Sequence, residues 1–238
     1  MIRAVGMGAL AGASLLGGAA LAFGVRGRSS QMFGASACRG SKNRKTLALT
    51  FDDGPSESTP EVLNLLARHG ISATFFQCGA NIRRLPAAAR EVRDAGHEIG
   101  NHSDTHARLY LRSARFIYRE FHAAQRTIED TLDLSATLMR APFGARWFGF
   151  RAAQEALGLL GVMWTIIGRD WTLDGAGVAQ RVLESAVNGA IICLHDGREL
   201  QPNPNVCSTL DALAKIVPGL IAKGYQFQTV SRLLCPTN

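Results

Sequence analysis

The chain has 238 residues, which is long enough for one sizeable hydrophobic core or at most two small ones. Its formal net charge of +7 resides in the N-terminal tail: residues 1–45 contain seven of the 26 Lys and Arg residues and no Asp or Glu, and the remainder balances 19 basic against 19 acidic side chains. A neutral body without a nucleic-acid motif excludes nucleic acid as the expected partner, and the basic tail suits a membrane surface or an anionic cell-wall polymer.

The first feature along the chain is an uncharged stretch of 22 residues, 4–25. Its length suffices to cross a bilayer, but it consists largely of Gly and Ala, which is typical of a signal peptide or a weak anchor. The segments Ala20-Leu21-Ala22 and Ala35-Ser36-Ala37 both have the small-x-small pattern of a cleavage site. The sequence therefore predicts export, and leaves open whether the segment is cleaved or kept.

These observations divide the chain into three parts. We expect a signal peptide or N-terminal membrane anchor over residues 1–30, a basic linker over residues 31–44 and one folded domain over residues 45–238. The protein is expected to act in the periplasm, in the cell envelope or as a secreted protein, with membrane association through the N-terminus as one outcome.

The five cysteines form no complete disulfide framework. Cys78 and Cys193 lie within apolar runs and are predicted to be buried free thiols. In an exported protein Cys235 is free to pair with Cys38 or with Cys207, and the sequence does not choose between them. No Cys-x-x-Cys occurs, so a cysteine-ligated zinc site is not expected.

From about residue 46 onward, short β-branched or aromatic runs alternate with amphipathic helical patterns. A helix is predicted between Thr59, which is followed by a proline, and Gly70. Further helices are predicted over 86–95, 113–131, 151–158, 176–187 and 208–223. Strands are predicted over 46–51, 72–76, 97–100, 136–140, 161–166, 190–195 and 226–230. Seven strands alternating with helices indicate a parallel α/β fold, either an open sheet or a barrel.

Polar residues occur where these predicted strands end. They are Asp52 and Asp53 after the first strand, His102 after the third, Arg140 at the end of the fourth, Asp170 and Trp171 after the fifth, and His195 at the end of the sixth. In βα architectures the carboxyl ends of the strands share one face, where active sites collect. Five separate segments are therefore expected to deliver polar side chains to the same rim.

The residue types at this rim suggest a metal-assisted hydrolase. One carboxylate of the Asp52–Asp53 pair, together with the two imidazoles of His102-Ser103-Asp104-Thr105-His106, makes a three-ligand metal site with a position open for water or substrate. The second carboxylate remains free to transfer protons. The residues alone do not say which aspartate has which role.

Four sequence motifs resemble those of the polysaccharide deacetylase family, the NodB-homology domain of carbohydrate esterase family 4. They are TFDDGP at residues 50–55, HSDTH at residues 102–106, RAPF at residues 140–143 and a Leu-x-His-like ending at residues 192–196. The family's fourth motif, D-x-x-D-W, is altered here to IGRDW at residues 167–171, so that Ile167 replaces the first acid. The resemblance covers about residues 45–235 and implies a distorted (β/α)7-type barrel of parallel strands.

The resemblance also implies a role for each residue. Asp52 would be the catalytic base, oriented by Arg140, and His195 the catalytic acid, oriented by Asp170. The metal ligands would be Asp53, His102 and His106, with Zn²⁺ as the expected divalent ion and Co²⁺ or Mn²⁺ as alternatives. Substrate contacts are expected from Phe143, Trp171 and Leu194.

The expected activity is a metal-dependent hydrolysis that removes N-acetyl groups from an amino-sugar polymer or oligosaccharide of the chitin or peptidoglycan type. It would use metal-bound water, an Asp base and a His acid. The alternatives are an O-acetyl esterase acting on a polysaccharide such as xylan and a carbohydrate-binding pseudoenzyme. A serine esterase is not expected, because the chain has no Gly-x-Ser-x-Gly elbow. We expect a monomer.

Overall fold

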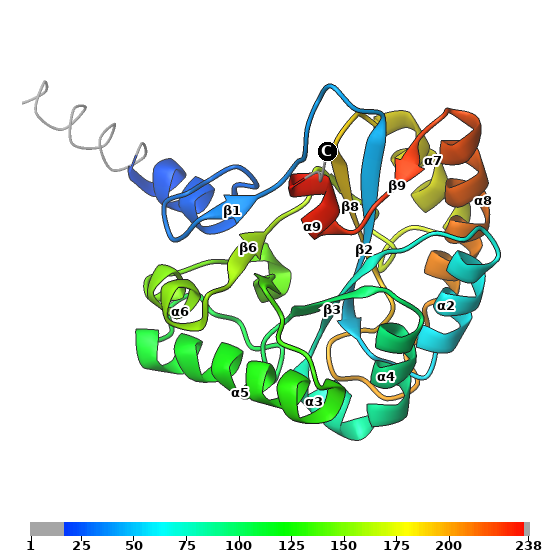
Figure 1. Cartoon of the computed structure of the whole chain (residues 1–238). Coiled ribbons are helices and arrows are strands. Elements are labelled where there is room, and N and C mark those ends of the chain that lie inside the picture. Colours follow the sequence, from blue (N-terminus) through cyan, green and yellow to red (C-terminus); the bar gives the residue numbers. More distant parts are fainter. Residues whose placement is uncertain (1–16, 236–238) are drawn as a thin grey trace, which may run out of the picture.

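The computed structural model describes residues 17–235, in which parallel strands form one curled sheet surrounded by helices (Figure 1). The strands are β1 (Ser36–Ala37), β2 (Thr46–Gly54), β3 (Thr74–Gln77), β4 (Glu98–Asn101), β5 (Leu138–Met139), β6 (Leu160–Val162), β7 (Ile166–Ile167), β8 (Ala190–His195) and β9 (Gln226–Phe227). Their order in the sheet is β1-β6-β5-β4-β3-β2-β8-β7, and β9 pairs with the start of β2. The predicted parallel, barrel-like α/β fold is therefore confirmed as a curled half-barrel.

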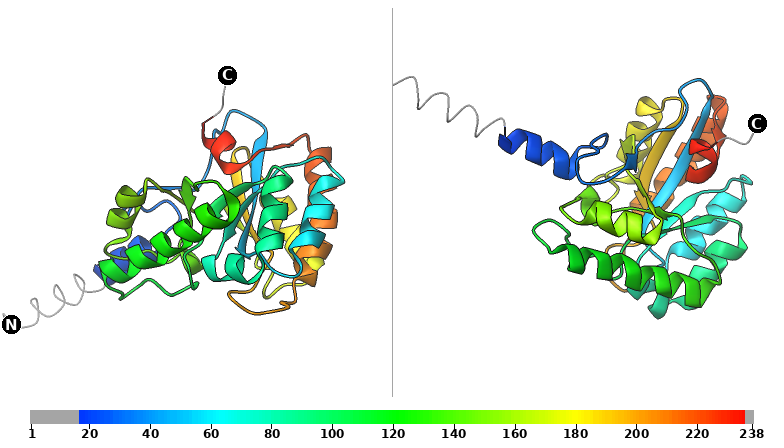
Figure 2. Two further views of the ribbon diagram at one scale, coloured as in Figure 1. Left: turned by 60° about the horizontal axis from the view of Figure 1, so that its bottom comes forward. Right: turned by 60° about the vertical axis from the view of Figure 1, so that its left-hand side comes forward.

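The helices are α2 (Thr59–Ala67), α3 (Gly79–Arg84), α4 (Pro86–Asp94), α5 (Ala114–Leu132), α6 (Phe150–Leu157), α7 (Gly175–Ser185), α8 (Cys207–Ala222) and α9 (Val230–Leu234), with the short 3₁₀ turn η1 (Pro142–Gly144). In both views of Figure 2, α2 (cyan) and α8 (orange) lie at one end of the molecule, and the helical residues 17–26 (blue) lie at the other end, near the β1 edge of the sheet. Helices α3 and α9 were not predicted, because each has fewer than seven residues, which is less than two helical turns and too short for an apolar pattern to repeat.

One predicted strand, 161–166, is divided in the structure into β6 and β7. Strand β6 pairs with β5 and β1 near one edge of the sheet, whereas β7 pairs with β8 at the other edge. Only three residues, 163–165, join the two strands. Because such a short link cannot span a flat sheet of this width, the sheet must curl.

Alternation along the strands separates the outer core from the inside of the half-barrel. On β2, Leu47, Leu49 and Phe51 pack outward into the main core beneath the helices, so Thr50 and Asp52 face inward. The same alternation holds on β8, where the residues facing inward include Cys193 and His195. Strand register places Thr50 beside Cys193 and Asp52 beside His195.

The N-terminal part of the described chain packs on this domain. Residues 17–26 are helical, and β1 adds a strand to the sheet beside β6 (Figure 1). Part of the predicted basic linker, 31–44, thus contributes to the sheet. The predicted signal peptide or anchor over residues 1–30 lies partly outside the described residues. Within residues 17–235, no helix has the length and apolar character needed to cross a membrane.

All five cysteines lie in the described part of the chain, and none of them is in a disulfide. Cys78 and Cys193 are buried free thiols, as predicted. The two pairings considered for Cys235 are absent from this structure, since Cys38, Cys207 and Cys235 are all free.

Candidate active site

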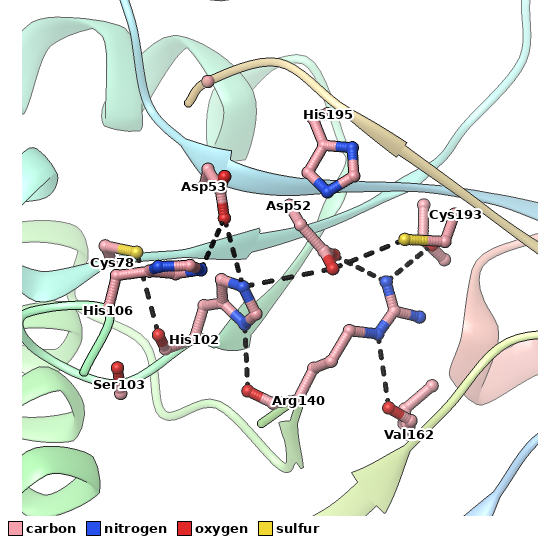
Figure 3. A network of polar contacts seen from close by, with 12 residues as sticks. Asp52, Asp53, Cys78, His102, Ser103, His106, Arg140, Val162, Cys193 and His195 are labelled. Carbon is pink, nitrogen blue, oxygen red and sulfur yellow. Dashed lines mark hydrogen bonds and ion pairs between the residues drawn. The ribbon is translucent and has the colours of Figure 1, made fainter. Parts of the chain in front are cut away.

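A cavity of about 670 Å³ opens at the carboxyl ends of β2 and β8. It brings together residues that are far apart in the sequence, and Figure 3 shows most of its polar network. Eight of the predicted site and neighbouring residues line it, namely Asp52, Asp53, His102, His106, Phe143, Ile167, Trp171 and His195. The expectation that several strand ends deliver side chains to one rim is confirmed.

A local irregularity in β2 directs both aspartates into this cavity. Neighbouring residues of a regular strand point to opposite faces, which would turn Asp53 away from Asp52. The register with β3 shifts between Asp52 and Gly54, and Asp53 has a left-handed φ of 73°. This bulge re-aims the Asp53 side chain, so that two consecutive carboxylates share the site.

The two histidines come from the loop after β4 and not from a helix. Ser103 and His106 have left-handed φ values of 65° and 52°. The resulting turn directs both rings toward Asp53, whose Oδ1 lies 3.2 Å from His102 Nε2 and 3.0 Å from His106 Nε2 (Figure 3). Burial raises the pKa of the Asp53 carboxyl, but the adjacent imidazoles of His102 and His106 hold it well below its ordinary value. Asp53 is therefore an ionised carboxylate.

The hydrogen bonds around these three side chains fit a bound cation. His102 Nδ1 lies 2.9 Å from the carbonyl oxygen of Arg140, an acceptor, so Nδ1 carries a proton and Nε2 is the ring atom left to bind a cation. Asp53 Oδ2 accepts from the Glu199 N–H at 2.8 Å, whereas Oδ1 is buried and receives no hydrogen bond. An oxygen and two nitrogens that converge within 4.8 Å make a candidate metal site.

Asp52 is held by a buried guanidinium. Arg140 Nη1 lies 2.5 Å from Asp52 Oδ1 and also donates to Thr50 Oγ1 at 2.8 Å. The Arg140 side chain is fully buried, and its Nε donates to the carbonyl oxygen of Val162 at 3.2 Å. Asp52 Oδ2 accepts from the Cys193 thiol at 3.4 Å. The carboxylate is thus fixed at the wall of the cavity.

His195 and Asp170 form a second buried pair. Asp170 Oδ1 lies 2.8 Å from His195 Nδ1, while Oδ2 accepts from the His195 N–H and from Thr209 Oγ1. Burial lowers the pKa of His195, but the Asp170 carboxylate, followed by Asp53 and Asp52, raises it to about 9. Because Asp170 is satisfied by these donors, Ile167 leaves no gap in its hydrogen bonding.

The apolar residues predicted to contact substrate differ in their placement. Phe143 is 37% exposed and Trp171 48% exposed, and both line the cavity. Leu194 is fully buried in the main core and is not among the lining residues. The prediction for Leu194 is corrected by strand alternation: Cys193, two residues before His195, occupies the inward face.

Residues that the sequence did not point to also support the site from behind. Asn81 Nδ2 donates to the carbonyl oxygens of Asp53 and Glu199, each at 2.8 Å, and so ties the two segments together. The Glu199 carboxylate lies 4.0 Å from His106 Nδ1. No local pattern signals these contacts. For Cys193 a signal existed, namely its position two residues before His195.

Two other acidic residues near the motifs serve the structure. Asp104 forms an ion pair with Arg83 at 2.7 Å and does not line the cavity. Asp196 is buried behind the site, where its Oδ2 accepts from Thr59 Oγ1 at 2.6 Å. Burial, followed by the neighbouring Asp53 carboxylate, raises the pKa of Asp196 to about 7.

Comparison with known proteins identifies relatives of one kind. The polysaccharide deacetylase family profile matches residues 39–162. The chain is 36% identical over 197 residues to a peptidoglycan-N-acetylglucosamine deacetylase of Bacillus cereus, and the match covers 81% of this chain and 89% of that protein. It is 36% identical over 185 residues to a chitooligosaccharide deacetylase of Sinorhizobium fredii, with coverage of 74% and 86%. The peptidoglycan-N-acetylglucosamine deacetylase PgdA of Listeria monocytogenes is 34% identical over 194 residues, but the 81% of this chain that aligns spans only 39% of that relative.

Solved structures agree with these matches. A peptidoglycan N-acetylglucosamine deacetylase in complex with an N-hydroxybenzamide superimposes with a TM-score of 0.79 at 28% identity, covering 85% of this chain and 94% of the other. A carbohydrate esterase family 4 pseudoenzyme from Bacillus anthracis superimposes with a TM-score of 0.76 at 27% identity, covering 84% and 68%.

Proposed function

Because the chain belongs to the polysaccharide deacetylase family, we propose that it is a metal-dependent hydrolase that removes N-acetyl groups from an amino-sugar polymer or oligosaccharide. Relatives named as peptidoglycan and chitooligosaccharide deacetylases support this substrate class. The observation that carries the proposal is the grouping of three units around one cavity: the Asp53–His102–His106 cluster, the Asp52–Arg140 pair and the His195–Asp170 pair.

We assign the metal to Asp53, His102 and His106, with Zn²⁺ expected and Co²⁺ or Mn²⁺ as alternatives. The chemistry that such an ion supplies when bound is the activation of water and the polarisation of the acetyl carbonyl. The chain itself provides ligand orientation, because the carbonyl oxygen of Arg140 fixes the His102 tautomer and the Glu199 N–H holds Asp53 Oδ2. These contacts leave the facing atoms of all three side chains available to a cation.

Asp52 is the proposed general base. Its Oδ1 is engaged by Arg140, and its Oδ2 lies 4.0 Å from Nε2 of His102, one of the proposed metal ligands. A carboxylate held at this distance can accept the proton of an attacking water. Because Arg140 is itself anchored to backbone and side-chain acceptors, the base has little freedom to turn away.

His195 is the proposed general acid. With its pKa raised to about 9 the ring is cationic at neutral pH, and Nδ1–H donates to Asp170. The Nε2–H is then available to protonate the departing amine. Phe143 offers a second stabilising group. The Gly144 and Ala145 N–H groups close η1, whereas the Phe143 N–H has no acceptor within residues 17–235, and we propose that it donates to a developing oxyanion. The exposed Trp171 and Phe143 rings would form walls against a sugar.

The alternatives make different demands on the site. A pseudoenzyme, such as the B. anthracis relative, is disfavoured because every residue assigned to the metal, the base and the acid is present and faces the cavity. An O-acetyl esterase would use the same residues and differ only in substrate. We further propose that the protein is exported and monomeric; if the N-terminal segment is kept, it would attach the protein to the membrane.

Acetate release tests the proposal. The purified full chain should release acetate from chitin oligosaccharides or peptidoglycan after loading with zinc or cobalt, and not after chelation. Release from acetylxylan alone would favour the esterase, and no release from any of the three by metal-loaded protein would refute the hydrolase. Asp53→Ala should abolish release, whereas the matched Asp104→Ala change, which removes an ion pair away from the cavity, should leave most of it.

A further inference from the structure

The N-terminal segment, residues 23–38, is built into the domain; we call it the N-terminal strap. Its main anchor is Arg146, whose side chain is only 1% exposed. The Arg146 guanidinium donates to the carbonyl oxygen of Ser30 at 2.7 Å, to Ser36 Oγ at 3.0 Å and to the carbonyl oxygen of Gly27. A buried guanidinium that lost these acceptors would be left without compensation, so the domain requires the strap.

Other contacts hold the strap along its length. Strand β1 pairs with β6, and the Thr165 Oγ1 hydroxyl donates to the carbonyl oxygen of Cys38 at 2.6 Å. Gln154 Nε2 donates to the carbonyl oxygen of Ala35 at 2.8 Å. Phe33 is buried and packs against Phe148 at a ring distance of 4.9 Å. The strap is therefore a fixed wall of the molecule.

This wall places Arg26 at the catalytic cavity. Arg26 lines the same cavity as Asp52, His195 and Trp164. The other arginine that lines the cavity, Arg198, already donates hydrogen bonds to the carbonyl oxygens of Gly197 and Asp170. Among residues 17–235, by contrast, no acceptor or carboxylate engages the Arg26 side chain.

We infer that Arg26 is a binding site for a carboxylate of the substrate polymer, so that the enzyme prefers an anionic amino-sugar polymer to a neutral one such as chitin. The inference rests on the proposed function, and it adds the substrate class. A guanidinium presents a planar set of N–H donors that matches a carboxylate, and an arginine without a protein partner is free to bind one. Residues 1–45 contain no acid that could compete for it.

Paired substrates test the inference. Metal-loaded protein is assayed with a peptidoglycan glycan fragment that carries free lactyl carboxylates, with the same fragment after the carboxylates are converted to amides, and with a chitin oligosaccharide of equal length. Arg26→Gln should raise KM for the anionic fragment about tenfold, as expected for one charge-assisted hydrogen-bonded contact, and leave the two neutral substrates within about twofold. Arg115→Gln, which removes one charge from the exposed first turn of α5, is the matched control.

Equal KM changes on all three substrates, or no change on the anionic fragment, would overturn the inference. Calorimetry of the free and amidated fragments with metal-free protein tests the Arg26 subsite separately from the proposed function, because binding needs no turnover. A preference for the free carboxylate that disappears in Arg26→Gln would support the subsite even if no acetate were released. Equal affinity of the wild type for both fragments would refute it.

Maturation of the exported protein has to preserve this subsite. Arg26 and the acceptors of Arg146 must remain in the exported protein, which is compatible with cleavage near Ala22 or with no cleavage. Intact-mass analysis of the exported chain should therefore find an N-terminus before residue 26. A mature chain that begins after Ala37 would remove Arg26 and overturn the proposal.

Discussion

Replacing Asp170 by Asn tests the most specific electrostatic claim about this site, that Asp170 keeps His195 cationic. Two donors, the His195 N–H and Thr209 Oγ1, converge on Asp170 Oδ2, so the amide oxygen of Asn must take that position. The amide NH₂ then faces His195 Nδ1, which becomes an acceptor. The variant thus removes the negative charge and also disfavours the proton on Nδ1.

The size of the effect follows from the pKa of His195. With Asp170 present the pKa is about 9, so roughly 97% of the ring is cationic at pH 7.5. Without Asp170, only the Asp53 and Asp52 carboxylates oppose the burial that lowers the pKa of His195, so this pKa falls toward the ordinary 6.5, at which roughly one tenth of the ring is cationic at pH 7.5. A general acid with a raised pKa is protonated and active below that pKa, and its activity is lost as pH rises through it. We therefore expect a loss of kcat/KM of up to about tenfold at pH 7.5 and a much smaller loss at pH 5.5.

The assay is the pH profile of acetate release, with an NMR titration of His195 as an independent readout. Asp174→Asn is the matched control, because Asp174 caps α7 through its side chain and Asn is an equivalent cap. A metal ion would offset part of the contribution of Asp53, so the shift between variant and wild type is the quantity to compare. An alkaline limb that stays in place, with activity reduced equally at every pH, would refute the electrostatic role.

Three further predictions concern the metal, the base and a buried acid. Saturating zinc should raise the thermal midpoint of metal-free protein by several degrees in scanning fluorimetry, which corresponds to about 2.7 kcal/mol at a hundredfold excess over Kd. His106→Ala should lose this rise, whereas the exposed His122→Ala should keep it. Arg140→Met leaves Asp52 buried without its partner and should lower the free energy of unfolding in urea by about 3–5 kcal/mol. A double variant that adds Asp52→Asn should regain part of this stability, and a double variant that regains none would contradict the pairing. In metal-free protein, the raised pKa of Asp196 contributes stability that is complete below its unfolded pKa of 3.8 and is lost as pH rises through about 7. The free energy of unfolding of Asp196→Asn should therefore rise relative to that of the wild type by up to about 1.4 kcal/mol per pH unit over that window. A difference that does not change with pH would argue against the raised pKa.

Much of the fold could be predicted from the sequence because its signals are local. Apolar runs mark β2, β3 and β8, and the helix that begins at Thr59 carries its proline and the glycine that follows it. The grouping of polar residues at strand ends followed from a rule about parallel strands, and the cavity bears it out for Asp52, His102 and His195.

The remainder depended on contacts between distant segments. Strand β1 has only two residues and exists because β6 lies beside it, so no periodicity reveals it. The division of 161–166 into two strands reflects the curl of the sheet, and not a property of that segment. Leu194 was misplaced for a different reason: the period of two along β8 was available in the sequence, and it places Cys193 on the face of His195.

The distribution of partners around Asp52 and Asp53 explains why two adjacent, chemically identical residues would have separate roles. A regular strand would have left only one of them in the cavity, and the bulge at Asp53 admits both. Asp52 then meets a fixed cation, Arg140, which occupies one of its oxygens and sets the direction of the side chain. Asp53 accepts a backbone N–H on one oxygen and has the Nε2 atoms of two imidazoles beside the other, so this second oxygen and the two nitrogens form one set of ligands for a cation. The proposed base and the proposed metal ligand are therefore distinguished by what surrounds each side chain, and exchanging their roles would require exchanging Arg140 with the two histidines.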